Sequence, residues 1–161
     1  MPKIKVGFGY DIHPFKKGRK LILGGVHVPF ERGLEGHSDG DVLLHSICDA
    51  LLGAANLGDI GKHFPNKDKR YKDISSLRLL GEVKELLQKK ELVIENIDST
   101  IIIEEPNLSS FKQKMKVNIA RTLEVSSSQI NIKATTNEGL GAIGKGEGIA
   151  AYAVVLLKKG E

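Results

Sequence analysis

Apolar residues recur along this chain with two different periods, and their alternation most constrains the fold. Every second residue is apolar between 3 and 9, at Ile4, Val6 and Phe8, which predicts a strand. Residues 21–28 predict two short strands around a Gly-Gly turn. Segments rich in β-branched residues predict the remaining strands, at 92–94, 97–103, 130–136 and 149–157.

Helical spacing marks three further segments. The first predicted helix begins at Ser38, with Asp41 three positions later in capping-box spacing, and its apolar stripe continues to Ala55. Two more helices are predicted at about 76–90 and 109–124. This order predicts one α/β domain over residues 1–161, an α+β arrangement in which a mixed sheet carries helices on one face. The last strand shows little alternation, so both of its faces are expected to be buried, with another subunit as the candidate cover for one of them.

The composition restricts the classes of function. With a net charge of +4, few aromatic residues and no Trp, the chain lacks the surface typical of nucleic-acid binding, and a small anionic substrate suits it better. The basic segment 16–20 is expected to be a solvated loop. No apolar run reaches membrane-spanning length and no signal peptide is recognisable, so we expect a soluble, cytoplasmic protein. Cys48 is expected to be a buried core thiol.

Two separated clusters predict a metal site. Asp11 and His13 lie two apart in an extended stretch, so their side chains share one face. An isolated Asp-x-His pair is more often a turn and a surface histidine, but His45 on the predicted helix supplies a third ligand. Three protein ligands with one open position are typical of catalytic zinc, and a single cysteine excludes a closed thiolate site.

The neighbours of His45 suggest how the ligand is oriented. Asp41, His45 and Asp49 form a polar stripe on the predicted helix, and Asp49 is a candidate to orient the imidazole, although Asp41 is equally well explained as a helix cap. His37 and Ser38 fall at the predicted helix N-terminus, where free N–H groups favour phosphate.

A second polar segment, 133–141, combines hydroxyl groups with the carboxylate of Glu138. This set suits a Mg²⁺ ion bound to phosphate, although an ordinary polar loop would explain it equally well on its own. The glycines between 139 and 148 do not form a Walker A pattern. Since the chain also lacks a Gly-x-Ser-x-Gly elbow, an enzyme of this sequence would take its nucleophile from the substrate or from water.

Five motifs in sequence order resemble the 2-C-methyl-D-erythritol 2,4-cyclodiphosphate synthase family. They lie at 7–13, 36–41, 57–65, 133–136 and 144–149. The resemblance implies that 4-diphosphocytidyl-2-C-methyl-D-erythritol 2-phosphate is cyclised by attack of its 2-phosphate on the β-phosphorus, with release of CMP, in non-mevalonate isoprenoid biosynthesis. This would make the protein a phosphorus–oxygen lyase.

The resemblance also assigns roles to single residues. It implies Zn²⁺ at Asp11, His13 and His45, a Mg²⁺ or Mn²⁺ ion bridging the substrate phosphates at Glu138, and transition-state stabilisation by His37 and Thr136. Residues 64–68 resemble a mobile lid and 103–109 a cytosine-binding stretch. The substrate-binding residues that it implies are Ser38, Asp59, Ile60, Gly61, Phe64, Pro65, Asn66, Asp68, Ile103, Glu105, Pro106, Asn107, Leu108, Ser109, Thr135, Thr136, Asn137, Ala142 and Lys145.

The family architecture implied is a homotrimer of chorismate-mutase-like or ferredoxin-like chains with active sites between subunits. Residues 144–148 would line a central channel. Lys145 stands where some members have Arg and Ala142 where some have an aromatic residue, which argues against an isoprenoid diphosphate in that channel. Asn107 replaces a basic residue of some members, so one phosphate or nucleotide contact is expected to be weaker.

Two other functions remain compatible with the residues. A zinc-dependent nucleotide-diphosphate hydrolase would use metal-bound water and give a linear product. A zinc-stabilised trimer that binds the nucleotide without turnover would release no CMP.

Overall fold

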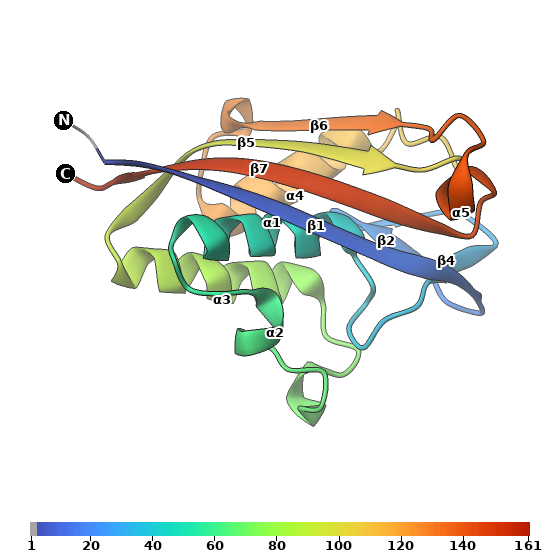
Figure 1. Cartoon of the computed structure of the whole chain (residues 1–161), viewed down its shortest axis with the longest axis horizontal. Helices are drawn as coiled ribbons and strands as arrows, with labels where there is room; N and C mark the ends of the chain where they lie inside the picture. The colour runs from blue at the N-terminus through green and yellow to red at the C-terminus, as the bar shows by residue number, and fades with distance from the viewer. Residues whose placement is uncertain (1–2) are drawn as a thin grey trace.

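The computed structural model describes residues 3–161 as one mixed sheet with helices packed on it (Figure 1). The strands are β1 (Ile4–Lys17), β2 (Leu21–Leu23), β3 (Val26–Val28), β4 (Arg32–Leu34), β5 (Leu92–Ile102), β6 (Ile130–Thr135) and β7 (Gly148–Lys159). The helices are α1 (Val42–Ala54), α2 (Ile60–His63), α3 (Ser76–Lys89), α4 (Lys112–Leu123) and α5 (Gly141–Gly144), with short 3₁₀ turns at Lys69–Tyr71 and Ser127–Gln129. None of the described helices is long and apolar enough to cross a membrane.

The main sheet has the order β4-β1-β7-β5-β6. Strand β7 is antiparallel to both β1 and β5, and only β5 and β6 are parallel. Strands β2 and β3 form a separate hairpin. The mixed sheet and the α/β class therefore match the sequence-based prediction.

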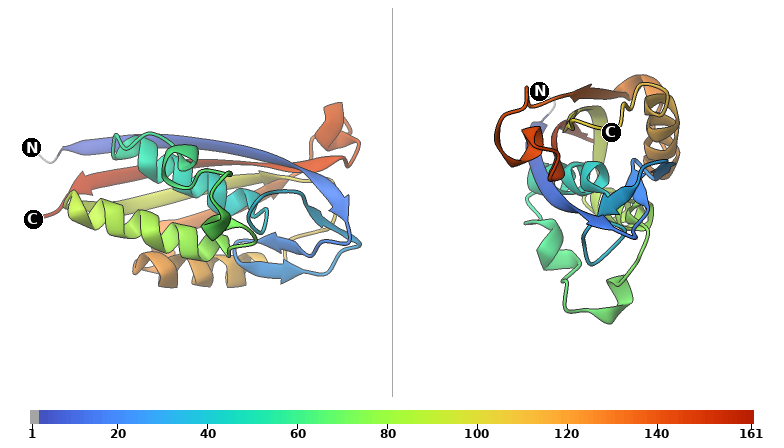
Figure 2. Two further views of the ribbon diagram at one scale, coloured as in Figure 1. Left: turned by 90° about the horizontal axis from the view of Figure 1, so that it is seen from below. Right: turned by 90° about the vertical axis from the view of Figure 1, so that its right-hand side faces the viewer.

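Helices α1, α3 and α4 gather on one face of the sheet (Figure 2). Along β1 the alternation is strict: Val6 and Phe8 point outward and are exposed, while Gly7 and Gly9 face α1 and are buried. A Cβ atom on Gly9 would lie 1.8 Å from the carbonyl oxygen of Ser46. The two glycines therefore let the backbone of α1 lie directly against the strand that carries Asp11 and His13.

Replacing Gly9 with alanine is expected to destabilise the fold by about 3 kcal/mol or more, because strand and helix must separate to accept the methyl group. Gly53→Ala is the matched control. Gly53 lies near the end of α1 with open space around its Cβ position, so alanine there is expected to stabilise by about 0.5–1 kcal/mol. Urea unfolding of both variants measures the difference. Equal stability of the two would contradict this account of how β1 and α1 pack.

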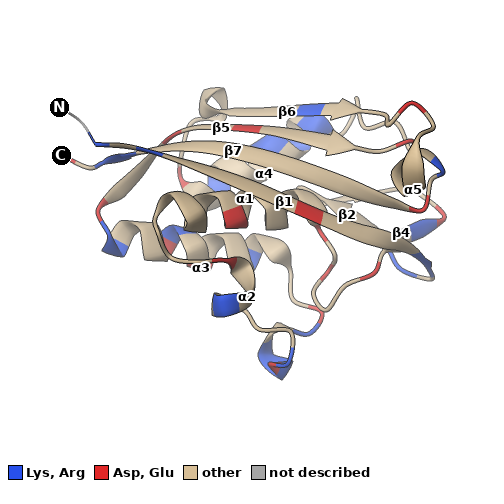
Figure 3. Ribbon diagram, in the orientation of Figure 1, with Lys and Arg blue, Asp and Glu red and all other residues tan. Residues whose placement is uncertain are grey.

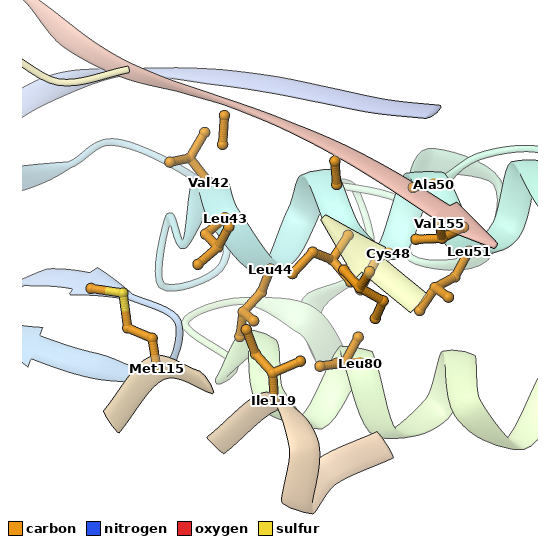
Figure 4. Packing of buried hydrophobic residues seen from close by; sticks show 14 of the residues in the cluster. Val42, Leu43, Leu44, Cys48, Ala50, Leu51, Leu80, Met115, Ile119 and Val155 are labelled. Atoms are coloured by element: carbon orange, nitrogen blue, oxygen red, sulfur yellow. The ribbon is translucent and has the colours of Figure 1, made fainter. Parts of the chain in front are cut away.

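The core lies between the sheet and the helices (Figure 4). Leu44, Cys48 and Leu51 of α1 meet Leu80 of α3 and Ile119 of α4, and all five are fully buried. Burial raises the pKa of the Cys48 thiol. The prediction of a buried core thiol is confirmed, and Cys48 is not a nucleophile.

Strand β1 is longer than the sequence pattern predicts. It continues through Pro14 to Lys17, so Asp11 and His13 lie within the strand and not at its end. Proline is accommodated because the ladder does not need its missing N–H: Pro14 pairs with Gly148, and its carbonyl oxygen accepts the N–H of Glu35 at 2.9 Å.

The start of the first helix also differs from the prediction. Helix α1 begins at Val42, and Asp41 is its N-cap, with a carboxylate that accepts the N–H of Leu44 at 3.1 Å. Ser38 therefore lies in the preceding loop, where Gly40 takes a positive φ of 75° that a helix cannot continue. The capping-box prediction was wrong, and the alternative of Asp41 as a cap is confirmed.

Other differences concern short or irregular elements. The strands predicted at 92–94 and 97–103 form the single strand β5, which contains a register shift between Ile94 and Asn96. The third long helix begins at Lys112, three residues after the predicted start. Strand β4 and the one-turn helix α2 were not predicted, because three or four residues are too few to show a period.

Candidate active site

Asp11, His13 and His45 meet where β1 crosses the first turn of α1. The Oδ2 atom of Asp11 lies 2.9 Å from Nε2 of His13 and 3.0 Å from Nδ1 of His45, and the two nitrogens are 3.4 Å apart. Tetrahedral zinc with bonds of about 2.0–2.2 Å holds its ligand atoms about 3.3–3.6 Å apart. The three atoms therefore already form a triangle of nearly the size that one divalent ion requires, and the three residues that the sequence grouped could hold a metal ion.

The ring of His13 is oriented by the backbone. Its Nδ1 atom lies 2.6 Å from the carbonyl oxygen of Glu35, which can only accept, so Nδ1 carries a proton and Nε2 is the nitrogen left for Asp11 or for a metal ion. Burial opposes charge at both residues, but their mutual hydrogen bond outweighs it. The pKa of His13 is raised, and hydrogen bonds from both histidines lower the pKa of Asp11 to about 2. The carboxylate is thus held in the ionised form that binds metal.

The loop that follows β4 carries His37 and Ser38 over this triangle. Nε2 of His37 donates to the carbonyl oxygen of Asp68 at 3.1 Å, and the carbonyl oxygen of His37 accepts the N–H of Asp73 at 2.8 Å. The Oγ atom of Ser38 lies 3.0 Å from Nε2 of His45. The predicted catalytic loop is therefore joined on one side to the segment that resembles a lid.

Arg19 holds the same loop from the other side. Its guanidinium donates to the carbonyl oxygens of Gly36 at 3.0 Å and Ser38 at 2.7 Å. The expectation of a solvated loop at 16–20 was wrong: Lys16 and Lys17 end β1 and pair with β4, and Arg19 is held by these two contacts. A lone Arg in a basic stretch carries no signal in the sequence that distinguishes it from its solvated neighbours.

Arg19→Lys is expected to lower the catalytic rate about tenfold while the protein stays folded, because one ammonium cannot span two carbonyl oxygens as a guanidinium does. The adjacent Lys20→Arg is the control, since Lys20 is exposed. Steady-state kinetics of both variants make the comparison. An unchanged rate in Arg19→Lys would show that the clamp on Gly36 and Ser38 does not position the loop.

A cavity of about 250 Å³ opens next to the triangle. Its lining includes residues that the sequence resemblance implied for the site: Ile60, Gly61, Phe64, Asn66, His37, Ser38 and the three residues of the triangle. Gly36, Tyr71 and Leu79 also line it and were not predicted. Asp59 caps α2 by accepting the N–H of Lys62 at 3.0 Å, and Asp68 binds Arg70 at 2.6 Å. These two carboxylates and Pro65 lie in the surrounding loops but not in the lining of the cavity.

A second cavity, of about 490 Å³, lies between the end of β5 and the end of β6. All the residues predicted at 103–109 line it, with Thr135 and Thr136 facing them. Phe30 and Lys112 also line it and were missed by sequence reasoning: Phe30 comes from a distant segment that only the fold brings here, whereas Lys112 begins α4 three residues after the predicted stretch.

The two cavities have no lining residue in common. The remaining predicted residues belong to neither: Asn137 donates its backbone N–H to Glu104, Glu138 is exposed directly after it, and Ala142 and Lys145 lie in and after α5. Within one chain the structure therefore separates the metal half of the predicted site from the nucleotide half.

Asp49 does not orient His45. Its carboxylate accepts the N–H of Ile60 at 2.8 Å and so fixes the start of α2, and within residues 3–161 it makes no hydrogen bond to the imidazole. The hypothesis from helix spacing was wrong. Ser38 and Ser76 approach the ring instead, and Ser76 is a residue that the sequence did not single out.

Comparison with known proteins places this geometry in a family. A profile described as the YgbB family matches residues 4–158. The 2-C-methyl-D-erythritol 2,4-cyclodiphosphate synthase of Syntrophomonas wolfei is 55% identical over 156 residues, which cover 97% of this chain and 99% of that protein.

Solved structures agree. The bifunctional IspDF of Campylobacter jejuni matches with a TM-score of 0.95 and 44% identity. The match covers 99% of this chain and 43% of that protein. The CDP complex of IspF from Plasmodium falciparum matches with a TM-score of 0.86 and 36% identity over 98% of this chain and 97% of the other. With matches of this extent in sequence and fold, the chain belongs to the YgbB family.

Proposed function

We propose that this protein converts 4-diphosphocytidyl-2-C-methyl-D-erythritol 2-phosphate into 2-C-methyl-D-erythritol 2,4-cyclodiphosphate and CMP, in the non-mevalonate route to isoprenoids. An oxygen of the substrate's 2-phosphate forms the new bond to the β-phosphorus as the bond to the CMP phosphate breaks. The proposal is carried by the Asp11–His13–His45 triangle beneath the His37–Ser38 loop, in a chain of the YgbB family.

The donor set at the triangle fits Zn²⁺, the metal that we propose there. Two imidazole nitrogens and one carboxylate oxygen would hold the ion beside the cavity that the same three residues line, a donor set typical of catalytic zinc. When bound, the ion neutralises phosphate charge. Asp11 supplies the only anionic ligand, so the loaded site keeps a net positive charge that favours a diphosphate.

The protein side chains have positioning and electrostatic tasks. His37, held by the carbonyl oxygen of Asp68, and Thr136, at the edge of the second cavity, are proposed to stabilise the charge that develops on the phosphates. Ser38 and Asp59 are proposed to fix the diphosphate and the methylerythritol. Glu138 is exposed two residues after Thr136 and is proposed to hold a Mg²⁺ or Mn²⁺ ion, which would neutralise charge on the substrate phosphates.

Residues 103–109 and 134–136 are proposed to hold the cytidine. Their cavity has the size of a small-molecule site, and its lining includes the aromatic Phe30 and the cationic Lys112. A cytidine nucleotide as ligand also agrees with the CDP bound to the similar Plasmodium falciparum protein.

We further propose a homotrimer whose active sites lie between subunits, in the cytoplasm. The sheet face opposite the helices is apolar and open, with Val6 67% and Phe8 61% exposed and with Tyr152 and Val154 beside them. Figure 3 shows that β7 carries no charged residue over most of its length. A monomer rarely exposes such a patch, and a symmetric assembly that covers it would bring the nucleotide half of one chain to the metal half of the next.

Release of CMP from the substrate tests the proposed turnover. The zinc-loaded protein is expected to release one CMP per substrate consumed, and the same protein treated with EDTA to release none. Tight CDP binding without CMP release in the presence of both metals would contradict an enzyme and favour a nucleotide-binding trimer.

A further inference from the structure

We propose that Asp39 and Ser76 are positioning residues for the metal ligand His45, because together they fix which nitrogen of its ring carries the proton. The inference rests on the zinc site proposed above and adds two residues that coordinate neither metal nor substrate.

The first step is the contact with the ring. Nε2 of His45 points away from Asp11 and His13 and lies 2.9 Å from Oγ of Ser76, a fully buried residue at the start of α3. A hydroxyl can donate or accept, so this contact alone does not decide the tautomer.

The second step is the partner of the serine. The hydroxyl of Ser76 donates to Oδ1 of Asp39 at 2.5 Å, a carboxylate oxygen that can only accept. With its own proton committed, Oγ of Ser76 must accept from His45. Nε2 therefore carries a ring proton, so in the metal-loaded site the lone pair of Nδ1 would be left for the metal.

The third step is the rigidity of Asp39. Its carboxylate also accepts the backbone N–H of Ser76 at 2.9 Å and that of Asp41 at 3.1 Å. The N-cap residue of α3, Ser75, makes no side-chain cap, so Asp39 satisfies a backbone N–H of the first turn in its place. The positive end of the helix dipole also favours the negative charge of the Asp39 carboxylate. The carboxylate is thereby fixed in place before any metal binds.

The arrangement separates the tasks of the two serines beside His45. Ser38 also lies within 3.0 Å of Nε2, but Ser76 already accepts the ring proton. The hydroxyl proton of Ser38 is thus free to turn to a phosphate oxygen in the adjoining cavity. Hydrogen-bond partners of this kind orient metal-bound histidines in many metalloproteins, usually through a carboxylate in direct contact; here a serine stands between the two.

Zinc affinity of Ser76→Ala, measured by competition with a chelator, tests the proposal. The expected loss is about 10–100-fold relative to wild type. Ser46→Ala is the matched control: Ser46 is equally buried, adjoins His45 on α1 and donates to the carbonyl oxygen of Leu43 at 2.8 Å. Its zinc affinity is expected to stay within about twofold, with the two variants equally stable without metal.

A loss below about fivefold in Ser76→Ala, or an equal loss in both variants, would overturn the proposal. If the wild type bound no zinc, the proposed zinc site itself would be rejected. Failure of the zinc site and failure of the role of Ser76 can therefore be told apart. Nitrogen NMR of the histidine rings in the wild-type, zinc-loaded protein needs no variant. We expect a proton on Nε2 of His45, and a proton on Nδ1 would contradict the proposal.

Discussion

His45→Ala is expected to reduce zinc affinity below detection and CMP release by at least about 10²–10³-fold. His45 is the only one of the three ligands on α1, and without it Asp11 and His13 present two donors on one side of the metal position. Two donors do not hold zinc against competing water and chelators. Zinc content by atomic absorption and CMP release by chromatography measure both effects.

His27→Ala is the control for this variant. His27 is an exposed histidine of β3 and lies outside both cavities, so neither zinc content nor rate should change. Normal turnover by His45→Ala would contradict the role of the triangle in the reaction.

Phe8→Glu is expected to convert the protein to a monomer and to reduce turnover by about 10²-fold or more, while each chain still binds zinc. The side chain lies in the exposed apolar face of the sheet, next to Tyr152 at a ring distance of 5.9 Å. A carboxylate costs little there in the single chain but would be buried without a partner in the assembly. Light scattering gives the mass, and chelator competition gives the zinc affinity.

Val117→Glu is the matched control, since Val117 is an exposed apolar residue on the opposite side of the molecule, in α4. It should leave mass and rate unchanged. A fully active Phe8→Glu monomer would show that one chain contains a complete site.

A co-expression experiment examines the shared site directly. His45→Ala inactivates the metal half and Thr136→Ala the nucleotide half, so each homotrimer should be inactive. A site in a mixed trimer is intact where the Thr136→Ala chain supplies the metal half and the His45→Ala chain supplies the nucleotide half. Random mixing of equal amounts of the two chains should therefore restore about one quarter of the sites. Absence of any recovery in verified mixed trimers would place both halves in one chain.

Local periodicity accounted for most of the fold. Strand β1 was identified from the alternation at Ile4, Val6 and Phe8, and α1 from the apolar stripe between Leu44 and Ala55. In both elements the spacing of the apolar residues repeats often enough to be recognised. The pattern failed where packing decides the outcome. Strand β1 passes through Pro14 because β7 and the segment after β4 supply its partners, and no local signal reports partners that are distant in sequence.

The site shows the same division. Asp11 and His13 could be paired from their spacing alone, and His45 from its place beside an apolar stripe. Asp49 has the correct spacing for a second carboxylate partner but binds the N–H of Ile60, whereas Ser76 lies 31 residues from His45 and reaches it through the packing of α3 on α1. Spacing predicts neighbours on one helix, and it cannot predict neighbours across two.

Phosphorus NMR of the product tests the central claim most directly. The zinc-loaded protein, given the cytidyl diphosphate substrate and Mg²⁺, is expected to yield CMP and an equal amount of a cyclic diphosphate whose two coupled phosphorus signals include no phosphomonoester. A linear diphosphate or a monophosphate would contradict intramolecular cyclisation and would assign the Asp11–His13–His45 site to a zinc hydrolase that activates water.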